Sequence, residues 1–563
     1  MFKSSTMIKL FSVFSFVIFG IVFIKLFYLQ VIEGDKYAEL VEMQSDPRLT
    51  VVTDRGYIYD KEGKLLARNK STGSLFAYRR NIPNKYEFFK ALEENGIIVS
   101  SRNKKSLRES DSFTWVARQI DLEKAVRLAN EIEGLEYFVE DSRFYPQGSL
   151  MANVIGFTGS DNIGRSGIEY FLEDRLKGEK ISVAGLKDSR RKIILFEDKG
   201  ELAKPDTQVY LTLSSRVQAG AEYILREGAK TFGAKNGSVV AMDIKTGEII
   251  LSANVNGFNP HTYWKYPPAN WSNHGFNYVF EPGSTFKTVA FSYLHNANKL
   301  DRNRLIDTSK KITIGKYTYS DTKYYGTLTV DEVFTHSSNI GMTQLIRGEN
   351  SNRQDFYNFL VKSGFGEKTG IFGASEEAGR VKPVSDWSKT TLTSVAIGYE
   401  VLVTPLQVVR FYAAIANGGV MVNPKIVSRI VNGNEVAIPA HEEVQIISPE
   451  TAAYMLDLMK QTVEAGTGKR AKTQLTKLAG KTGTARVYDN KAGAYSTQNY
   501  SASFAGVFPA EDPKIAMIVV YESPRSSIYG GSTAANIFRQ IAEFISTEKH
   551  YFDPEIEVVS YEN

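Results

Sequence analysis

The chain of 563 residues contains no cysteine and only six histidines. The lack of cysteine excludes a disulfide framework, a thiolate nucleophile and any metal site with cysteine ligands. No two histidines stand three to five residues apart, so a histidine metal site is not expected. A general base in this chain would therefore be a lysine or a carboxylate.

A strong excess of charge is also missing. The 68 Lys and Arg residues stand against 63 Asp and Glu, which gives a net charge of +5 and no support for nucleic-acid binding. Hydrophobic residues make up 42% and charged residues 23%, so disorder along the whole chain is excluded. At this length, about three or four domains are expected.

A long uncharged run occurs once, near the N-terminus. It extends from Leu10 to Ile24 and continues past Lys25 to Leu29, and a bilayer needs about 20 apolar residues. Lys25 lies near the end of the run, where its side chain can reach the interface. A cleaved secretory signal is the alternative, but no small-x-small cleavage site follows the run. The sequence therefore predicts an uncleaved transmembrane anchor over residues 10–32.

The charges that flank this run predict its orientation. Lys3 and Lys9 precede the span, whereas Glu33 and Asp35 follow it. By the positive-inside rule, residues 1–9 are cytoplasmic and the rest of the chain is exported.

Two soluble domains are expected after the anchor. Residues 33–205 are mixed and loop-rich, and they end near the break at Lys204-Pro205-Asp206. In residues 206–550, strand patterns at both ends enclose helical patterns, which predicts one α+β domain whose sheet is closed by late strands. We expect residues 551–563 to form a loose acidic tail. The strand patterns lie at 238–243, 248–252, 501–508 and 514–521, and the helical patterns at 285–295, 331–346, 353–362, 405–416, 448–465 and 533–545.

The segment Glu281-Pro-Gly-Ser284-Thr-Phe-Lys287 contains a candidate nucleophile and its base. Because Pro and Gly break the preceding segment and helix-forming residues follow, Ser284 would lie at a helix N-terminus, where negative charge is favoured. Lys287 is three residues further on the same face, so its amine can reach the Ser284 hydroxyl. A serine needs such a base, and a desolvated lysine can serve as one. Four other Ser-x-x-Lys pairs lack the Pro-Gly break, and we interpret them as solvated polar faces.

The segment His336-Ser-Ser-Asn339 is the second candidate motif. By itself it is typical of a serine cap at the start of a helix. Beside a Ser-Lys pair, Ser337 could act as a proton shuttle for Lys287, and Asn339 offers a donor and an acceptor to a substrate amide.

Lys-Thr-Gly occurs three times. The copy at Lys245 lies between two strand patterns and is explained by a hairpin turn. The copy at Lys368 lies in a glycine-rich loop with no strand around it. The copy at Lys481 lies in a run of small residues that can form a strand beside a substrate, and we select this copy. Strand alternation places its lysine and glycine on one face and its two threonines on the other, and either face could meet the substrate.

The three motifs are weak individually, but in this order they predict a serine acyl-transfer site. At these residues the chain resembles the penicillin-binding proteins, and more narrowly the class B, monofunctional D,D-transpeptidases of peptidoglycan synthesis. Within class B, the segment that begins at Glu281 resembles the septal, cell-division branch, because the elongation branch usually has proline at the position of Glu281. The likeness extends to further segments: Asp54–Gly63, Arg143–Gly148, Gly164–Glu169, Gly398–Gln407, Ala413–Gly419 and Gly466–Gly468.

The resemblance implies an α+β fold in three parts. These are the single transmembrane helix, an elongated pedestal domain of the dimerisation type over 33–205, and a transpeptidase domain over 206–550. The last would be similar to serine β-lactamases, with an antiparallel sheet that carries helices on both sides. The implied location is a bacterial inner membrane, crossed once, with the catalytic domain on the periplasmic or extracytoplasmic side.

The resemblance also implies roles for the motif residues. Ser284 would attack the penultimate D-Ala carbonyl of a stem pentapeptide and pass its proton to Lys287, and the terminal D-Ala would leave. The backbone N–H groups of Ser284 and Thr484 would form the oxyanion hole. The implied catalytic residues are Ser284, Lys287, Ser337, Asn339, Lys481 and Thr484, and the implied substrate-binding residues are Thr482, Gly483 and Thr484.

The partners implied by the resemblance are a stem pentapeptide ending in D-Ala-D-Ala, β-lactam antibiotics, a membrane glycan-strand polymerase and division proteins. No nucleic acid, metal or organic cofactor is implied. Three alternatives are an elongation-branch transpeptidase, a serine β-lactamase and a non-catalytic membrane-tethered scaffold. A β-lactamase would have to activate water and would not need an anchor and a pedestal. Glu376 and Glu377 are carboxylates that could activate water, but we assign them no role.

Overall fold

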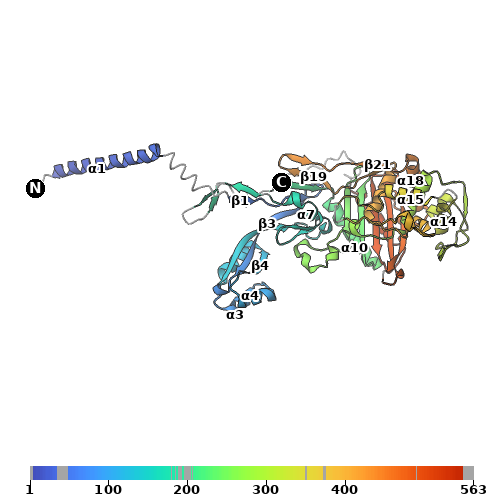
Figure 1. Ribbon diagram of the computed structural model, residues 1–563, viewed down its shortest axis with the longest axis horizontal. Coiled ribbons are helices and arrows are strands. Elements are labelled where there is room, and N and C mark those ends of the chain that lie inside the picture. The colour runs from blue at the N-terminus through green and yellow to red at the C-terminus, as the bar shows by residue number, and fades with distance from the viewer. Residues whose placement is uncertain are drawn as a thin grey trace. The chain divides into compact units, whose positions relative to one another are not determined.

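The computed structural model describes residues 4–33, 49–178, 180–183, 185–187, 193–195, 205, 207–348, 352–371, 376–489 and 491–548 (Figure 1). It divides into two compact units, Met1–Arg55 with Lys177–Pro205 and Gly56–Leu176 with Asp206–Asn563. The predicted tail over 551–563 and residues 204 and 206 of the predicted break lie outside the described residues. The domain boundaries therefore stay predictions.

The first unit contains the apolar N-terminal helix. Helix α1 (Ser4–Phe27) continues into the short π-helix η1 (Tyr28–Ile32). The stretch Phe11–Ile32 is long and apolar enough to cross a membrane, and it covers most of the predicted anchor. The same unit holds two small antiparallel pairs: β1 (Leu49–Val52) with β8 (Lys180–Val183), and β9 (Gly185–Lys187) with β10 (Ile193–Leu195).

A seven-stranded sheet opens the second unit. Its order is β20-β19-β11-β2-β3-β4, and β5 pairs with the other side of β3. β11 pairs in parallel with β2 and antiparallel with β19, so one sheet joins strands from both sides of the predicted break near residue 205. The strands are β2 (Tyr57–Tyr59), β3 (Leu65–Ala77), β4 (Thr114–Ile120), β5 (Leu135–Phe144), β11 (Thr207–Leu211), β19 (Val427–Asn432) and β20 (Glu435–Ala437), and the helices among them are α3 (Lys85–Glu94), α4 (Ser101–Glu109) and α5 (Leu122–Glu131).

A buried ion pair connects two segments of the pedestal region. Arg143 lies in β5, and its Nε is 2.6 Å from Oε1 of Glu169 in α7 (Gly167–Phe171). The two side chains are only 1% and 0% exposed, so each buried charge is compensated by the opposite charge of its partner rather than by water.

Glu169→Ala is expected to lower the free energy of unfolding by about 3–5 kcal/mol, because the substitution leaves the Arg143 guanidinium buried without its carboxylate. The measurement is urea unfolding of the full chain in detergent, followed by circular dichroism. The double variant Arg143→Met with Glu169→Leu removes both charges and is expected to recover most of the loss. Equal stability of Glu169→Ala and the unsubstituted chain would contradict the prediction.

A five-stranded antiparallel sheet forms the centre of the remaining fold. Its order is β13-β12-β24-β23-β22, and Figure 1 shows its green strands from the middle of the chain beside its orange and red strands from the C-terminal part. The strands are β12 (Asn236–Asp243), β13 (Ile249–Asn254), β22 (Ala479–Asp489), β23 (Ala494–Phe508) and β24 (Ile515–Glu522).

Helices cover both faces of this sheet. Along β12, Val239 and Ala241 pack in one buried cluster with α10 (Ser215–Phe232) and α19 (Ala534–Ser546). The alternating residues Val240 and Met242 pack in a second cluster with α17 (Pro405–Ala416) and α18 (Pro449–Glu464). Because alternate side chains enter clusters on opposite faces and both faces are covered, β12 has four consecutive apolar residues, Val239–Met242. The predicted α+β class, with helices on both sides of an antiparallel sheet, is confirmed.

Most helical patterns lie where the sequence predicts them, and one does not. α15 (Arg353–Lys362) and α17 begin and end at the predicted residues. The prediction of a single helix over 331–346 is wrong. The chain forms two helices there, α13 (Val330–Thr335) and α14 (Asn339–Ile346), with a break between them. The break lies at the second candidate motif.

Candidate active site

Ser284 lies in a tight turn that leads into a helix. The turn is the 3-10 helix η5 (Gly283–Phe286), and α12 (Lys287–Asn296) follows directly. Gly283 has a φ of 55°, and a Cβ at this position would lie 2.8 Å from the carbonyl oxygen of Thr484. Glycine is required there both by the left-handed backbone and by the close approach of the neighbouring strand.

Lys287 is completely buried and lies at the centre of a hydrogen-bond cluster. Its Nζ donates to the carbonyl oxygen of Ser337 at 2.6 Å, to the Ser337 Oγ at 3.2 Å and to the Asn339 Oδ1 at 2.8 Å. Burial lowers the pKa of Lys287 to about 7, although the negative charge of Asp321 acts in the opposite direction. A large share of this amine is therefore unprotonated near neutral pH, as a general base requires.

The hydrogen bond between Ser284 and Lys287 that the sequence makes possible is not formed within the described part of the chain. The three contacts of the amine go to Ser337 and Asn339 instead. Proton transfer from Ser284 to this amine therefore stays a prediction.

The break between α13 and α14 brings the Ser-x-Asn motif to Lys287. Ser337 has a φ of 61°, in the left-handed region, so the helix cannot continue through it. Ser338 caps α14, because its Oγ accepts a hydrogen bond from the Gly341 N–H at 2.8 Å. The Asn339 Nδ2 donates to the Ser320 carbonyl at 3.0 Å, which orients the amide oxygen towards Lys287.

The Asp321 carboxylate stabilises this turn through three hydrogen bonds, and this residue was not identified from the sequence. One carboxylate oxygen accepts from the backbone N–H groups of Asn339 at 2.5 Å and Ile340 at 3.0 Å. The other accepts from the Ser338 Oγ at 2.6 Å. Asp321 lies 17 residues before Ser338 in a loop, and no local pattern marks it, so only the tertiary structure shows its role.

Lys481 is buried in the first half of β22. Its Nζ lies 5.8 Å from the centroid of the Phe334 ring and 3.4 Å from the carbonyl oxygen of Thr482. Burial lowers the pKa of Lys481, and the charge of Lys287 lowers it further. An incoming carboxylate would reverse this effect, since an opposite charge favours the protonated amine. Lys481 is thus suited to bind a carboxylate that enters the site.

The strand that carries Lys481 is an edge strand. β22 pairs with β23 on one side, and η5 packs against it. A Cβ on Gly483 would lie 2.7 Å from the Pro282 carbonyl oxygen, so the face of Lys481 and Gly483 is turned towards the Ser284 segment. The structure thereby decides which face of the strand packs against this segment.

The two threonines of the motif lie on the opposite face. The Thr482 hydroxyl shares a hydrogen bond of 2.8 Å with the Thr467 hydroxyl, which belongs to the Gly466–Gly468 segment. The Thr484 Oγ1 accepts from the Gly530 N–H at 3.1 Å. Both hydroxyls are thus fixed by loops that lie beside β22.

The other two Lys-Thr-Gly copies have structural explanations. The copy at Lys245 is the turn between β12 and β13, and the Asp243 carboxylate accepts from the backbone N–H groups of Lys245 and Thr246. The copy at Lys368 lies in a loop, where Glu376 accepts from the next two backbone N–H groups at 2.9 and 2.8 Å. The buried Glu376 carboxylate therefore stabilises the backbone of this loop.

Glu281 connects the Ser284 segment to two other parts of the chain. Its Oε1 accepts from the Glu400 backbone N–H at 2.8 Å and from the Tyr495 hydroxyl at 2.9 Å. Burial raises the pKa of the Glu281 carboxyl, and these hydrogen bonds oppose that rise. Tyr495 belongs to β23, at its hairpin with β22, so Glu281 links this hairpin to the turn that contains Ser284.

Tyr495→Phe is expected to slow acylation of Ser284 by a penicillin about fivefold, because the substitution removes one hydrogen bond that positions the turn. The rate is measured by labelling with a fluorescent penicillin. Tyr488→Phe is the matched control, since Tyr488 faces Tyr495 on the same hairpin and is partly exposed. An equal effect of both substitutions would contradict the positioning role of the Tyr495 hydroxyl.

No group of three or more histidine, aspartate and glutamate side chains that could hold a metal ion occurs within the described ranges.

Two known families match the chain over most of its length. Residues 237–543 match the family described as "Penicillin binding protein transpeptidase domain", and residues 50–211 match the family described as "Penicillin-binding Protein dimerisation domain". The first match covers all of the predicted acyl-transfer motifs.

Individual proteins agree with these matches. The chain is 31% identical over 546 residues to stage V sporulation protein D of Bacillus subtilis, which covers 94% of this chain and 83% of that protein. It is 27% identical over 553 residues to peptidoglycan D,D-transpeptidase FtsI of Buchnera aphidicola, covering 95% and 93%. The crystal structure of penicillin binding protein 3 from Mycobacterium tuberculosis, complexed with aztreonam, is similar with a TM-score of 0.69 and 25% identity, over 89% of this chain and 97% of that chain.

Proposed function

Since the chain belongs to the class B penicillin-binding proteins and is a membrane-anchored peptidoglycan D,D-transpeptidase, we propose that it cross-links stem peptides through an acyl-enzyme on Ser284. The observation that carries this proposal is the buried Lys287 amine, whose pKa is about 7 and which contacts Ser337 and Asn339. A base with this pKa, one helical turn from a serine, is what acyl transfer by serine needs.

In the first half of the reaction, the Ser284 Oγ attacks the carbonyl carbon of the penultimate D-Ala, and its proton passes to the Lys287 Nζ. The new C–O bond makes a tetrahedral oxyanion, for which we propose the backbone N–H groups of Ser284 and Thr484. The C–N bond to the terminal D-Ala then breaks, and Ser337 delivers a proton to the leaving amine. The contact of 3.2 Å between the Lys287 Nζ and the Ser337 Oγ supports this path.

In the second half, an amine on a neighbouring stem peptide attacks the ester carbonyl. A new C–N bond forms, the C–O bond to Ser284 breaks, and the proton released by the amine returns to Ser284. The net result is one new peptide bond and one free D-Ala, with no change in oxidation state.

The remaining motif residues are assigned to substrate binding. We assign Lys481, with the hydroxyls of Thr482 and Thr484, to the terminal carboxylate, and Asn339 to the peptide chain. Gly483 lets the substrate-binding strand approach the Ser284 segment closely. The lowered pKa of Lys481 supports its role, because the incoming carboxylate restores the charge of the amine.

The test is to incubate the full chain in detergent with a fluorescent penicillin and to map the adduct by mass spectrometry. A stable adduct on the peptide that contains Ser284, absent when the chain is first unfolded in urea, is the expected result. Rapid release of hydrolysed drug would favour a serine β-lactamase instead. A folded chain that forms no adduct would contradict the acyl-enzyme and favour a scaffold.

We further propose that residues 1–9 are cytoplasmic, that residues 10–32 span the membrane, and that the pedestal (33–205) and the transpeptidase domain (206–550) lie on the periplasmic or extracytoplasmic side. The charges around the span support this orientation. A membrane glycan-strand polymerase would then supply the strands that this enzyme cross-links.

The septal branch is the finer assignment that we propose, with cell-division proteins as partners. It is supported by Glu281, with its contacts to Glu400 and Tyr495, and by the similarity to a relative named FtsI. The test is the position of a fluorescent fusion in dividing cells, with depletion of the protein as a second readout. A septal band and filamentous cells are expected, whereas a lateral pattern and rounded cells would favour the elongation branch.

A further inference from the structure

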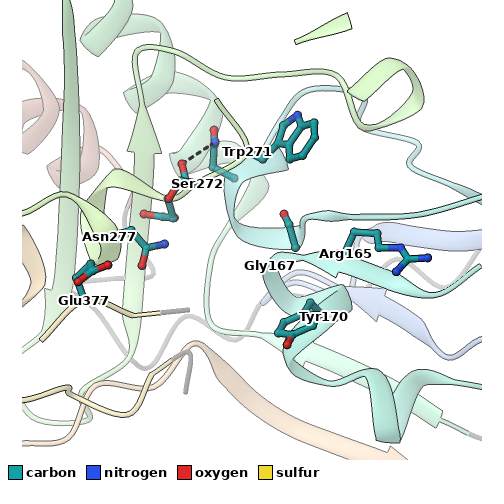
Figure 2. A pocket seen from close by; sticks show the side chains of 10 residues that line it. Arg165, Gly167, Tyr170, Trp271, Ser272, Asn277 and Glu377 are labelled. Atoms are coloured by element: carbon teal, nitrogen blue, oxygen red, sulfur yellow. Dashed lines mark hydrogen bonds between the residues drawn. The ribbon is translucent and has the colours of Figure 1, made fainter. Parts of the chain in front are cut away.

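A polar cavity of about 540 Å³ contains none of the residues assigned to acyl transfer. One wall comes from β7 (Gly164–Ser166) and α7, and the facing wall from residues 271–277 together with Glu377. Figure 2 shows Gly167 and Tyr170 on one side and Asn277 and Glu377 on the other. The size lies in the range of sites that hold a small ligand.

Several polar groups of this cavity have no partner within the part of the chain that the structure describes. The Ser166 Oγ is buried and makes no hydrogen bond. The Asn277 amide and the Glu377 carboxylate likewise make no side-chain hydrogen bond or ion pair there, although both line the cavity. A buried polar group is normally satisfied, so the Ser166 Oγ indicates a partner inside the cavity. The half-buried Asn277 amide and the exposed Glu377 carboxylate are free to bind the same partner.

The walls are fixed before any ligand arrives. The Asn153 Nδ2, from the short helix α6 (Ala152–Ile155), donates to the Ser272 carbonyl at 3.1 Å and so holds the wall formed by residues 271–277. The Trp271 ring lies 5.1 Å from the Phe157 ring, and its Nε1 donates to the Tyr263 carbonyl at 3.2 Å. A rigid site loses little entropy on binding.

The charge of the lining disfavours an anionic ligand. Arg165 is paired with Asp161, and Glu377 adds a negative charge on the opposite wall. What remains is a set of hydroxyl and amide groups together with the Tyr170 ring, which is half exposed. Hydroxyls, a carboxylate and an amide can pair with the hydroxyl and acetamide groups of a sugar, and the ring offers a flat apolar face.

We propose that this cavity binds a segment of an N-acetylated saccharide, namely the glycan strand that carries the stem peptides. The saccharide chemistry rests on the lining residues, whereas its assignment to the peptidoglycan strand rests on the proposed function. Bound there, the strand would be held by the same chain that processes its peptide, at a site separate from Ser284.

The test uses the trisaccharide of N-acetylglucosamine as the probe, because it has the acetamide groups and no stem peptide. Binding to the full chain in detergent is measured by calorimetry, before and after treatment with penicillin. We expect saturable binding with a Kd of about 1 mM or tighter that penicillin does not change. Asn277→Ala and Glu377→Gln are each expected to weaken binding about fivefold to tenfold, and Glu435→Gln, an exposed carboxylate on β20, is expected to leave it unchanged.

Absence of saturation, or saturation that both substitutions leave unchanged, would overturn the proposal. A stem pentapeptide without sugar that binds with the same dependence on Asn277 would also overturn it and assign the cavity to peptide. Labelling of Ser284 by fluorescent penicillin is read in the same samples. Normal labelling without saccharide binding therefore rejects only this inference, whereas saccharide binding without labelling rejects only the acyl-enzyme.

Discussion

Lys287→Met is expected to slow the acylation of Ser284 by a penicillin about 10³-fold, because it removes the proposed general base. The amine that it replaces is buried and has a pKa of about 7. The measurement is the second-order rate of labelling, with Ser284→Ala as the reference for background. A melting curve of each variant shows whether the fold is retained.

Lys287→Arg tests whether Lys287 accepts a proton or acts only as a hydrogen-bond donor. A guanidinium keeps its positive charge and its donors to Ser337 and Asn339, but it stays protonated at every pH of interest. We therefore expect a loss about as large as that of Lys287→Met. Near-normal acylation of Lys287→Arg would show that the lysine positions the site without accepting a proton.

The pH dependence of acylation follows from the same amine. Its folded-state pKa is lowered to about 7, so its free base is lost as the pH falls through 7. We expect the acylation rate to rise with pH up to about 7 and then to level off, with a fall of about tenfold for each pH unit below 6. A flat profile between pH 5 and 8 would contradict Lys287 as the base.

Asp321→Ala is expected to have the second largest effect, a loss of about 10²-fold in acylation, because a small displacement of catalytic groups costs about this much. The substitution removes the acceptor of the Ser338 hydroxyl and of the backbone N–H groups of Asn339 and Ile340. Leaving such donors unpaired should also lower the free energy of unfolding by about 3 kcal/mol. Labelling rates and urea unfolding measure the two effects.

Asp321→Asn is the matched control for the charge of this residue. The amide oxygen can still accept from the two backbone N–H groups, so we expect a smaller loss, about tenfold. The negative charge of Asp321 raises the pKa of Lys287, so its removal should move the acid limb of the pH profile to lower pH. Normal acylation by Asp321→Ala would contradict the positioning role, and a shift of the limb to higher pH would contradict the electrostatic one.

Local sequence is enough where the structure depends on neighbouring residues. α17 begins at the predicted residue because Thr404, Pro405 and Gln407 form a capping box with proline in the first turn. The membrane helix is likewise readable from about 20 consecutive apolar residues. The three motifs are short segments, so their residue types and order could be read without coordinates.

The sequence could not show how these motifs meet. It predicted one helix over 331–346, where the left-handed Ser337 divides the chain into two helices. It also left Asp321 unidentified, because this carboxylate reaches its partners only across a loop. The sequence also could not predict that β11 and β19 join the pedestal sheet, because strands that pair in a sheet can lie hundreds of residues apart in the chain.

By itself, the sequence determined the chemical groups of the site: two serines, two lysines, an asparagine and two threonines, in an order that predicts acyl transfer. The tertiary structure decided their reactivity. Lys287 and Lys481 have the same side chain as any surface lysine, and burial among helices and strands from distant parts of the chain is the largest cause of their lowered pKa values. Desolvation depends on every atom that surrounds a charge, and those atoms are brought together only by the folded chain.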